Sequence, residues 1–235
     1  MTLPDKTLGF ARSVGEDWSD KWKKDELLGF QQRYLYVHAL AACHTARSYW
    51  ILHREGQHNE CHILARNLLE RIFNSRVASK SPEHAVELIA SEVADRIRRL
   101  RLWQLDQATL PTGMEDTIKR YEGELRELLR LLGTTTAPQW DFYRRAQEAN
   151  ITWAYRGLYS EFSSYTHAGY EVSRPGELNK GWNVADFIAL LAPIDTARQL
   201  HKLSCFGAPC KVGEDYAALY SEIQRETLGE PISEA

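Results

Sequence analysis

The stretch around which the predicted fold is organised, residues 153–170, reads W-A-Y-R-G-L-Y-S-E-F-S-S-Y-T-H-A-G-Y. Read as an α-helix at about 100° per residue, it has one narrow polar stripe and an apolar opposite side. The apolar side carries Leu158, Phe162 and Tyr165. Gly169 is typical of a residue that ends a helix, so His167 falls in the last predicted turn. The stretch therefore predicts a helix that packs along one side against a core.

The polar stripe of this helix has an unusual composition. It contains Arg156, Ser160, Ser163 and His167. It lacks the alternating Lys and Glu residues that cover most solvent-exposed helix faces. Serine hydroxyls donate and accept hydrogen bonds, and a histidine can titrate near neutral pH. Two interpretations stay open: an interior contact between helices, or a site in which Arg156 supplies positive charge and His167 titrates.

Length and composition indicate an ordinary folded protein. The chain has 235 residues, of which 43% are hydrophobic and 26% are charged, as in globular proteins with a full core. Its net charge of -3 argues against a strongly basic nucleic-acid surface, although a local basic patch stays compatible with it. We find no secretory signal and no apolar run that could span a membrane, and the four cysteines lack metal-knuckle spacing. These features predict a cytoplasmic protein with free thiols and no membrane partner.

Helical periodicity recurs along the chain, and strand patterns are nearly absent. Residues 17–24 are predicted to begin a helical pattern that continues over residues 25–53. We expect further helices over residues 59–79, 81–107, 114–132, 138–150, 183–206 and 214–227, besides the central stretch. Residues 1–16 are predicted to be a flexible N-terminal arm and residues 229–235 a C-terminal tail. The predicted fold class is all-α: a single-domain helical bundle of about seven or eight helices over residues 17–228.

An Arg–Glu pair lies inside the predicted helix 59–79. Arg66 and Glu70 are one turn apart on a helix that is apolar on two sides. A helix of this kind is expected to be buried on both sides, so its charged groups need partners. The pattern is compatible with a simple intrahelical ion pair and with a larger polar cluster.

Known catalytic and metal-binding motifs are absent or incomplete. His58 and His62 are spaced to share a metal, but Asn59 stands where a zinc protease has Glu, so we expect neither a metal nor another cofactor. No glycine-rich phosphate loop or nucleophile elbow occurs. Arg47-x5-His53 loosely resembles the spacing of the HEPN superfamily of helical ribonucleases, but about two such matches arise by chance.

The longest Gly- and Pro-containing loop follows the central stretch directly. Long loops within compact domains are often functional, so residues 169–182 are a candidate lid. Tyr170, Arg174 and Trp182 could fold over the polar stripe. Together with Tyr159 and Ser160 they form the predicted ligand-binding set.

Two spaced patterns carry a family resemblance. Arg66-x3-Glu70 on a buried helix, followed by Tyr159-x3-Ser163-x3-His167 at a helix end, resembles the domain of unknown function 5677 family. Members are uncharacterised all-helical proteins, mostly bacterial, and the similarity in layout covers roughly residues 30–205. The resemblance implies a helical fold that draws Arg66, Glu70, Ser163 and His167 together, and it implies no known reaction.

The sequence leads to one hypothesis about a site. We expect a polar cluster inside the bundle, with His167 as its titrating member. Its members, and the candidate catalytic residues, are Arg66, Glu70, Arg156, Ser163 and His167. The favoured function is a module that binds a protein partner or a small ligand. The alternatives are a metal-independent ribonuclease of a bacterial conflict or phage-defence system, and a hydrolase or transferase without a recognisable motif. A homodimer stays open, and nucleic acid is the weakest partner.

Overall fold

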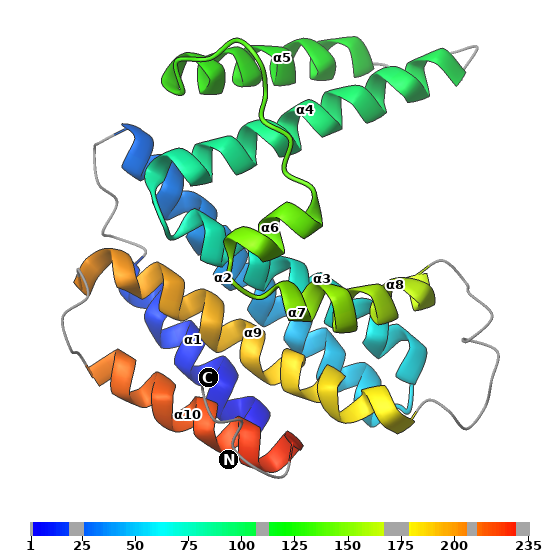
Figure 1. The fold of residues 1–235 in the computed structure, drawn as a ribbon, viewed down its shortest axis with the longest axis vertical. Coiled ribbons are helices and arrows are strands. Elements are labelled where there is room, and N and C mark those ends of the chain that lie inside the picture. The colour runs from blue at the N-terminus through cyan, green and yellow to red at the C-terminus, as the bar shows by residue number, and fades with distance from the viewer. Residues whose placement is uncertain (1, 19–25, 107–112, 167–178, 206–210, 229–235) are drawn as a thin grey trace.

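The computed structural model describes residues 2–18, 26–106, 113–166, 179–205 and 211–228, and all of its regular elements are helices (Figure 1). They are α1 (Leu3–Trp18), α2 (Glu26–Arg54), α3 (His58–Ala78), α4 (Pro82–Asp106), α5 (Met114–Leu131), α6 (Phe142–Glu148), α7 (Thr152–Ala154), the π-helical turn η1 (Tyr155–Tyr159), α8 (Ser160–Thr166), α9 (Asn179–Cys205) and α10 (Lys211–Leu228). The predicted all-α class is confirmed. Because α7, η1 and α8 are continuous, these ranges comprise nine helices, more than the seven or eight predicted.

Three long helices, α2, α3 and α9, form the centre of the molecule. On α2, Ala39, Ala42 and Ala46 are buried at spacings of three and four residues, so other helices can approach its backbone closely. Helix α9 is buried along most of its length, from Ala185 to Leu200. Helices α1 and α10 pack against α9, and the segment α6–α8 lies across α3.

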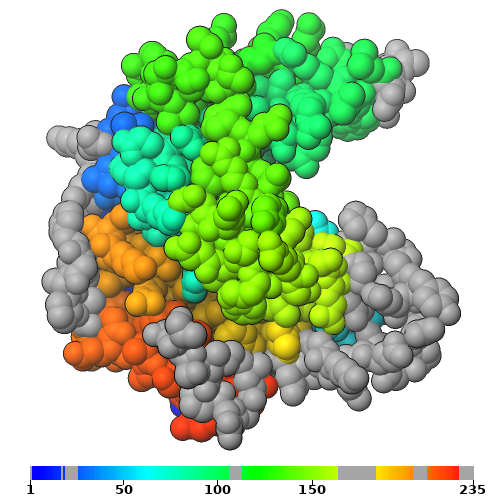
Figure 2. Space-filling view, in the orientation of Figure 1, coloured from blue at the N-terminus to red at the C-terminus, as the bar shows by residue number. Residues whose placement is uncertain are grey.

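Helices α4 and α5 form a hairpin with a small core of its own. That core contains Val86, Ala90, Val93, Ile97 and Leu128. The opposite face of α5 is charged and solvated, and it includes the pair Arg130–Glu127 at 2.7 Å. Ser81 caps the start of helix α4, because its hydroxyl accepts a hydrogen bond from the backbone N–H of His84. Figure 2 shows the hairpin as a lobe above the rest of the molecule.

The N-terminal segment differs from the predicted flexible arm. Residues Leu3–Trp18 form α1, which packs on α9 and α2. Ala11, Val14 and Trp18 are buried on one of its faces, each at most 3% exposed. Their helical spacing accounts for the difference, since an amphipathic segment gains stability by covering the core even though its other face is polar. The predicted tail, residues 229–235, lies outside the described residues.

A π-helical turn interrupts the central stretch. In η1 the backbone hydrogen bonds skip one additional residue, which rotates the following side chains relative to an ideal α-helix. Tyr159 is therefore 7% exposed, although an ideal helical wheel places it beside the polar stripe. Ala154 and Phe162 are also buried, while Arg156 and Ser160 are exposed. In the described ranges, no helix combines the length and the apolar composition that crossing a membrane requires.

A buried histidine on α2 makes folding sensitive to acid. His38 is 7% exposed and its ring lies 4.3 Å from that of Tyr34. Burial, with further contributions from Arg71 and Arg145, lowers the pKa of His38 to about 3. An unperturbed histidine has a pKa of about 6.5. Between about pH 3 and pH 6.5, His38 is therefore protonated in the unfolded chain and neutral in the folded protein. The contribution of His38 to stability is complete above about pH 6.5 and is lost as the pH falls.

We predict that His38→Gln weakens the pH dependence of unfolding. Between about pH 6.5 and 4.5, the slope of the free energy of unfolding against pH should decrease by up to about 1.4 kcal/mol per pH unit. Urea titrations across this range, with both proteins checked for helix content, measure the slope. A variant whose curve is lower but parallel to that of the parent would contradict the prediction.

Candidate functional site

A tyrosine hydroxyl joins the Arg–Glu pair that the sequence singles out. Arg66 Nη2 donates to Tyr159 Oη at 3.0 Å, and Tyr159 Oη donates to Glu70 Oε1 at 3.0 Å. Arg66 Nε lies 3.3 Å from Glu70 Oε1, and both charged side chains are about one-fifth exposed. The structure thus links α3 to the central stretch through Tyr159, which the sequence analysis placed in the ligand-binding set and in the family pattern but not in the predicted polar cluster.

The surroundings of Tyr159 keep its hydroxyl protonated. Its ring stacks on Tyr155 at 5.2 Å with an interplanar angle of 15°, and the guanidinium carbon of Arg66 lies 5.0 Å from the ring centroid. Burial raises the pKa of Tyr159 to about 12. Burial also raises the pKa of Glu70, although the hydrogen bond from Tyr159 opposes this effect. The trio therefore acts as a clamp between helices, with Tyr159 as a fixed donor to Glu70.

A second, more deeply buried network fixes α6. Arg145 is 6% exposed and donates to Asn74 Oδ1 at 2.8 Å, to Glu92 Oε1 at 3.2 Å and to the Trp140 carbonyl at 2.9 Å. Tyr34 donates to the same Glu92 oxygen at 2.8 Å. A buried guanidinium needs partners of this kind, and here they come from α3, from α4 and from the carbonyl of Trp140 before α6, while Tyr34 connects α2 to the network through Glu92. The sequence analysis did not single out any of these residues.

Two further predicted site residues, Arg156 and Ser160, do not join the clamp. Arg156 is exposed, and its Nη2 lies 3.4 Å from the Tyr143 hydroxyl. Ser160 is exposed and Ser163 is half-buried on α8. The polar stripe therefore faces solvent over its first turns. The rest of the predicted set lies outside the described residues: His167, Tyr170, Arg174 and the side chain of Trp182.

The histidines near the α2–α3 turn take structural positions. His53 Nε2 lies 3.4 Å from Asp186 Oδ1, and Tyr49 donates to the same oxygen at 2.9 Å. His62 is fully buried, with its ring 5.6 Å from that of Phe162. Over the described ranges, no three His, Cys, Asp or Glu side chains are grouped so that they could hold a metal.

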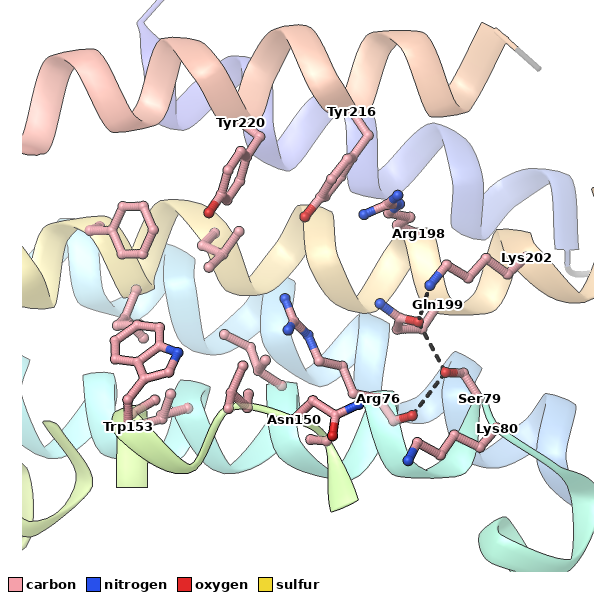
Figure 3. Close-up of a pocket in the computed structure, with 18 of the residues that line it drawn as sticks. Arg76, Ser79, Lys80, Asn150, Trp153, Arg198, Gln199, Lys202, Tyr216 and Tyr220 are labelled. Carbon is pink, nitrogen blue, oxygen red and sulfur yellow. Dashed lines mark hydrogen bonds between the residues drawn. The ribbon is translucent and has the colours of Figure 1, made fainter. Parts of the chain in front are cut away.

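A large cleft opens beside residues 149–154, which lie between the Arg145 network and the Tyr159 clamp (Figure 3). It has a volume of about 940 Å³ and lies between α3, residues 149–154, α9 and α10. Its basic lining residues are Arg76, Lys80, Arg198 and Lys202. Its aromatic lining residues are Trp153, Phe187, Tyr216 and Tyr220. None of the described lining residues is acidic.

Two of the four cations in the cleft are paired with carboxylates that do not line it. Arg76 donates to both oxygens of Asp195, at 2.8 and 3.1 Å, and Asp195 has no exposed surface. Burial disfavours the charge of Arg76, but the Asp195 carboxylate outweighs burial and raises the pKa of Arg76 further. Lys80 Nζ lies 2.5 Å from Glu148 Oε1. These pairs leave little unpaired positive charge where Arg76 and Lys80 line the cleft.

The other two cations, Arg198 and Lys202, have no carboxylate within ion-pair distance anywhere in the described ranges. They lie one turn apart on α9. The Arg198 guanidinium stands 4.1 Å from the centroid of the Tyr216 ring, and Lys202 Nζ donates to Gln199 Oε1 at 3.0 Å. Partial burial, together with the nearby charge of Arg198, lowers the pKa of Lys202. Electrostatically, this end of the cleft is suited to an anion.

The sequence carries a signal for this pair of cations. Arg198 and Lys202 follow the apolar run from Phe187 to Ile194 on the same helix, and two like charges one turn apart repel each other. The partners Asp195 and Tyr216 cannot be inferred from spacing, because the approach of α10 to α9 is a tertiary contact.

The fold and the cleft define the class of protein: an all-helical module with a cationic, aromatic-lined cleft and no metal cluster in its described part. The chain matches the family of unknown function DUF5677 over residues 32–175, which is more than half of its length. The protein belongs to this family, and the resemblance noted in the sequence is confirmed. Comparison with curated proteins finds no match. Comparison with solved structures finds none either.

We predict that the Tyr159 hydroxyl stabilises the fold through Arg66 and Glu70. Tyr159→Phe should lower the free energy of unfolding by about 1–2 kcal/mol, because it leaves two partly buried charged groups without their shared partner. Chemical denaturation measures the difference. Tyr155→Phe is the matched control, since its ring stacks on Tyr159 but its hydroxyl has no hydrogen bond in the described residues. Equal losses in the two variants would exclude a specific clamp.

The Arg76–Asp195 pair should respond asymmetrically to substitution. Arg76→Met leaves a carboxylate with no exposed surface and should cost about 5 kcal/mol, whereas Asp195→Asn leaves a guanidinium that can reach the cleft and should cost about 3 kcal/mol. The double variant should be more stable than Arg76→Met alone. Thermal and urea unfolding of the three variants test this order, and an Asp195→Asn protein less stable than Arg76→Met would overturn it.

Proposed function

We propose that this protein is a ligand-binding module, and that the cleft between α3, α9 and α10 takes a small molecule with a compact anionic group. One observation carries the proposal: Arg198 and Lys202 share a wall of the cleft without a carboxylate partner in the described residues. Two like charges on adjacent turns destabilise a helix by about 0.2–0.5 kcal/mol. A bound anion turns this repulsion into charge-assisted hydrogen bonding.

Size and lining support a ligand of low molecular weight. Clefts of about 300–1,000 Å³ are typical of small-molecule sites, and most of the lining here is apolar or aromatic. A few polar groups converge on the space, among them Gln199, which accepts hydrogen bonds from both Ser79 and Lys202 at 3.0 Å. This arrangement holds Lys202 toward the cleft (Figure 3).

The internal polar clusters gain a role from the position of the cleft. The Tyr159 clamp and the Arg145 network fix the two ends of the segment that includes Asn150, Ile151 and Trp153, which all line the cleft. Asn150 adopts a left-handed conformation, φ 59°, where the chain turns from α6 into α7. We infer that the clusters serve binding by holding one wall in place and that they do not react themselves.

The ribonuclease alternative has less support. It relies on Arg156 and His167, and Arg156 is an exposed residue whose guanidinium lies near Tyr143. His167 lies outside the described residues. The cations that gather around a concave surface are instead on α3 and α9, where the described lining includes no histidine to act as a general acid or base.

We predict that inorganic pyrophosphate binds in the cleft with a Kd of about 1 mM or tighter. Arg198→Gln/Lys202→Gln should weaken binding by about tenfold or more, because it removes both cations without a carboxylate partner. Isothermal titration calorimetry gives the affinities, and a rise in Tm with pyrophosphate gives a second readout.

The matched control removes two exposed cations far from the cleft, as Arg99→Gln/Lys119→Gln on α4 and α5. It changes net charge equally and should leave the affinity for pyrophosphate unchanged. If the control loses as much affinity as the cleft variant, binding is a general charge effect. If the parent protein shows neither heat nor a shift in Tm, the proposed function is wrong.

A further inference from the structure

The two ends of the cleft differ in chemistry (Figure 3). Arg198, Lys202 and Lys80 gather at one end, and Trp153 and Tyr220 lie at the other. Phe187 belongs to the aromatic end, because its ring packs edge-on against Tyr220 at 6.4 Å. A ligand that uses the whole cleft therefore has one charged end and one flat apolar end.

The aromatic end leaves an indole surface uncovered. Trp153 lines the cleft and is 60% exposed, although the adjacent Ala154 is buried. The opposite wall presents Phe187 and Tyr220. Indole and phenol rings on facing walls are a stacking platform for a planar heterocycle, and stacking of this kind accepts any nucleobase.

A glutamine lies on the α10 wall of the cleft. Gln224 lines the cleft, and only 5% of the residue is exposed. Gln224 is on the same helix face as Tyr216 and Tyr220, because the three are spaced by four residues. A carboxamide offers both a donor and an acceptor, which is the pattern that the edge of a nucleobase pairs with.

The distance between the ends suits a molecule of nucleotide length. Tyr216, beside Arg198, and Gln224 are separated by about 12 Å along α10, from a rise of 1.5 Å per residue. An inorganic anion would fill only the cationic end. An acidic peptide would supply charge but no heterocycle for Trp153 and Gln224.

We propose that the ligand is a nucleoside diphosphate, with its phosphates at Arg198 and Lys202 and its base between Trp153 and the α10 wall, where Gln224 pairs with the edge of the base. This assignment rests on the proposed function of the same cleft and specifies the class of its ligand. A diphosphate fits better than a single phosphate, because Arg198 and Lys202 lie one turn apart, neither has a carboxylate partner in the described residues, and each can meet one phosphate.

Calorimetric titrations with ADP, GDP, CDP, UDP and pyrophosphate test the assignment on the full chain. At least one nucleoside diphosphate should bind tenfold or more tightly than pyrophosphate. Trp153→Ala and Gln224→Leu should each remove most of that gain and leave pyrophosphate binding unchanged, while Trp153→Phe should retain much of it. Trp103→Ala, which removes another exposed indole on α4, is the matched control and should bind like the parent protein.

The outcomes separate the two proposals. If all four nucleotides bind no more tightly than pyrophosphate, the nucleotide assignment is wrong, and the anion-binding function stands. If neither pyrophosphate nor any nucleotide binds, both are wrong. If a single-stranded oligonucleotide competes at lower concentration than every nucleoside diphosphate, the ligand is a nucleic-acid strand and the assignment fails. A Trp103→Ala loss equal to that of Trp153→Ala also overturns it.

Discussion

The Arg76–Asp195 ion pair joins the last turns of α3 to the middle of α9, and the cleft depends on it. Asp195 has no exposed surface, so its charge is tolerated only because a guanidinium meets both of its oxygens. The Tyr216 hydroxyl lies 3.4 Å from the same carboxylate and brings α10 to the pair. One buried charge thus fixes the relative positions of three helices, and the space left between them is the candidate binding site.

Helix α3 carries a series of polar anchors along successive turns. Arg66 and Glu70 hold Tyr159, Asn74 accepts from Arg145, and Arg76 holds Asp195. Each anchor connects α3 to a different element: η1, α6 and α9. Polar contacts of this kind specify geometry more than they add stability, because a wrongly placed partner leaves a desolvated charge. These contacts therefore fix the position of the cleft wall that α3 and residues 149–154 form.

The sequence predicted the structure correctly where the local residue pattern and the environment of those residues in the fold agree. Helical periodicity predicted the all-α class, and a charged pair on a two-sided apolar helix singled out Arg66 and Glu70. An ideal helical wheel misplaced Tyr159, because the π-helical turn adds a residue to the repeat and no local signal announced it. Residues 1–16 were predicted to form a flexible arm, yet Ala11 and Val14 are buried where α1 packs on α9 and α2. The like charges of Arg198 and Lys202 are visible in the sequence, but the cleft that they line forms only through the tertiary contact between α9 and α10.

The family match spans residues 32–175, which include every side chain of the Tyr159 clamp and the Arg145 network but none of α9 or α10. One wall of the cleft therefore belongs to the shared scaffold, and the facing wall comes from helices beyond the matched region. A chain with the same scaffold could carry other side chains at positions 198, 202 and 224 without disturbing the Tyr159 clamp or the Arg145 network. Relatives built in this way would share an architecture and differ in the molecules they recognise.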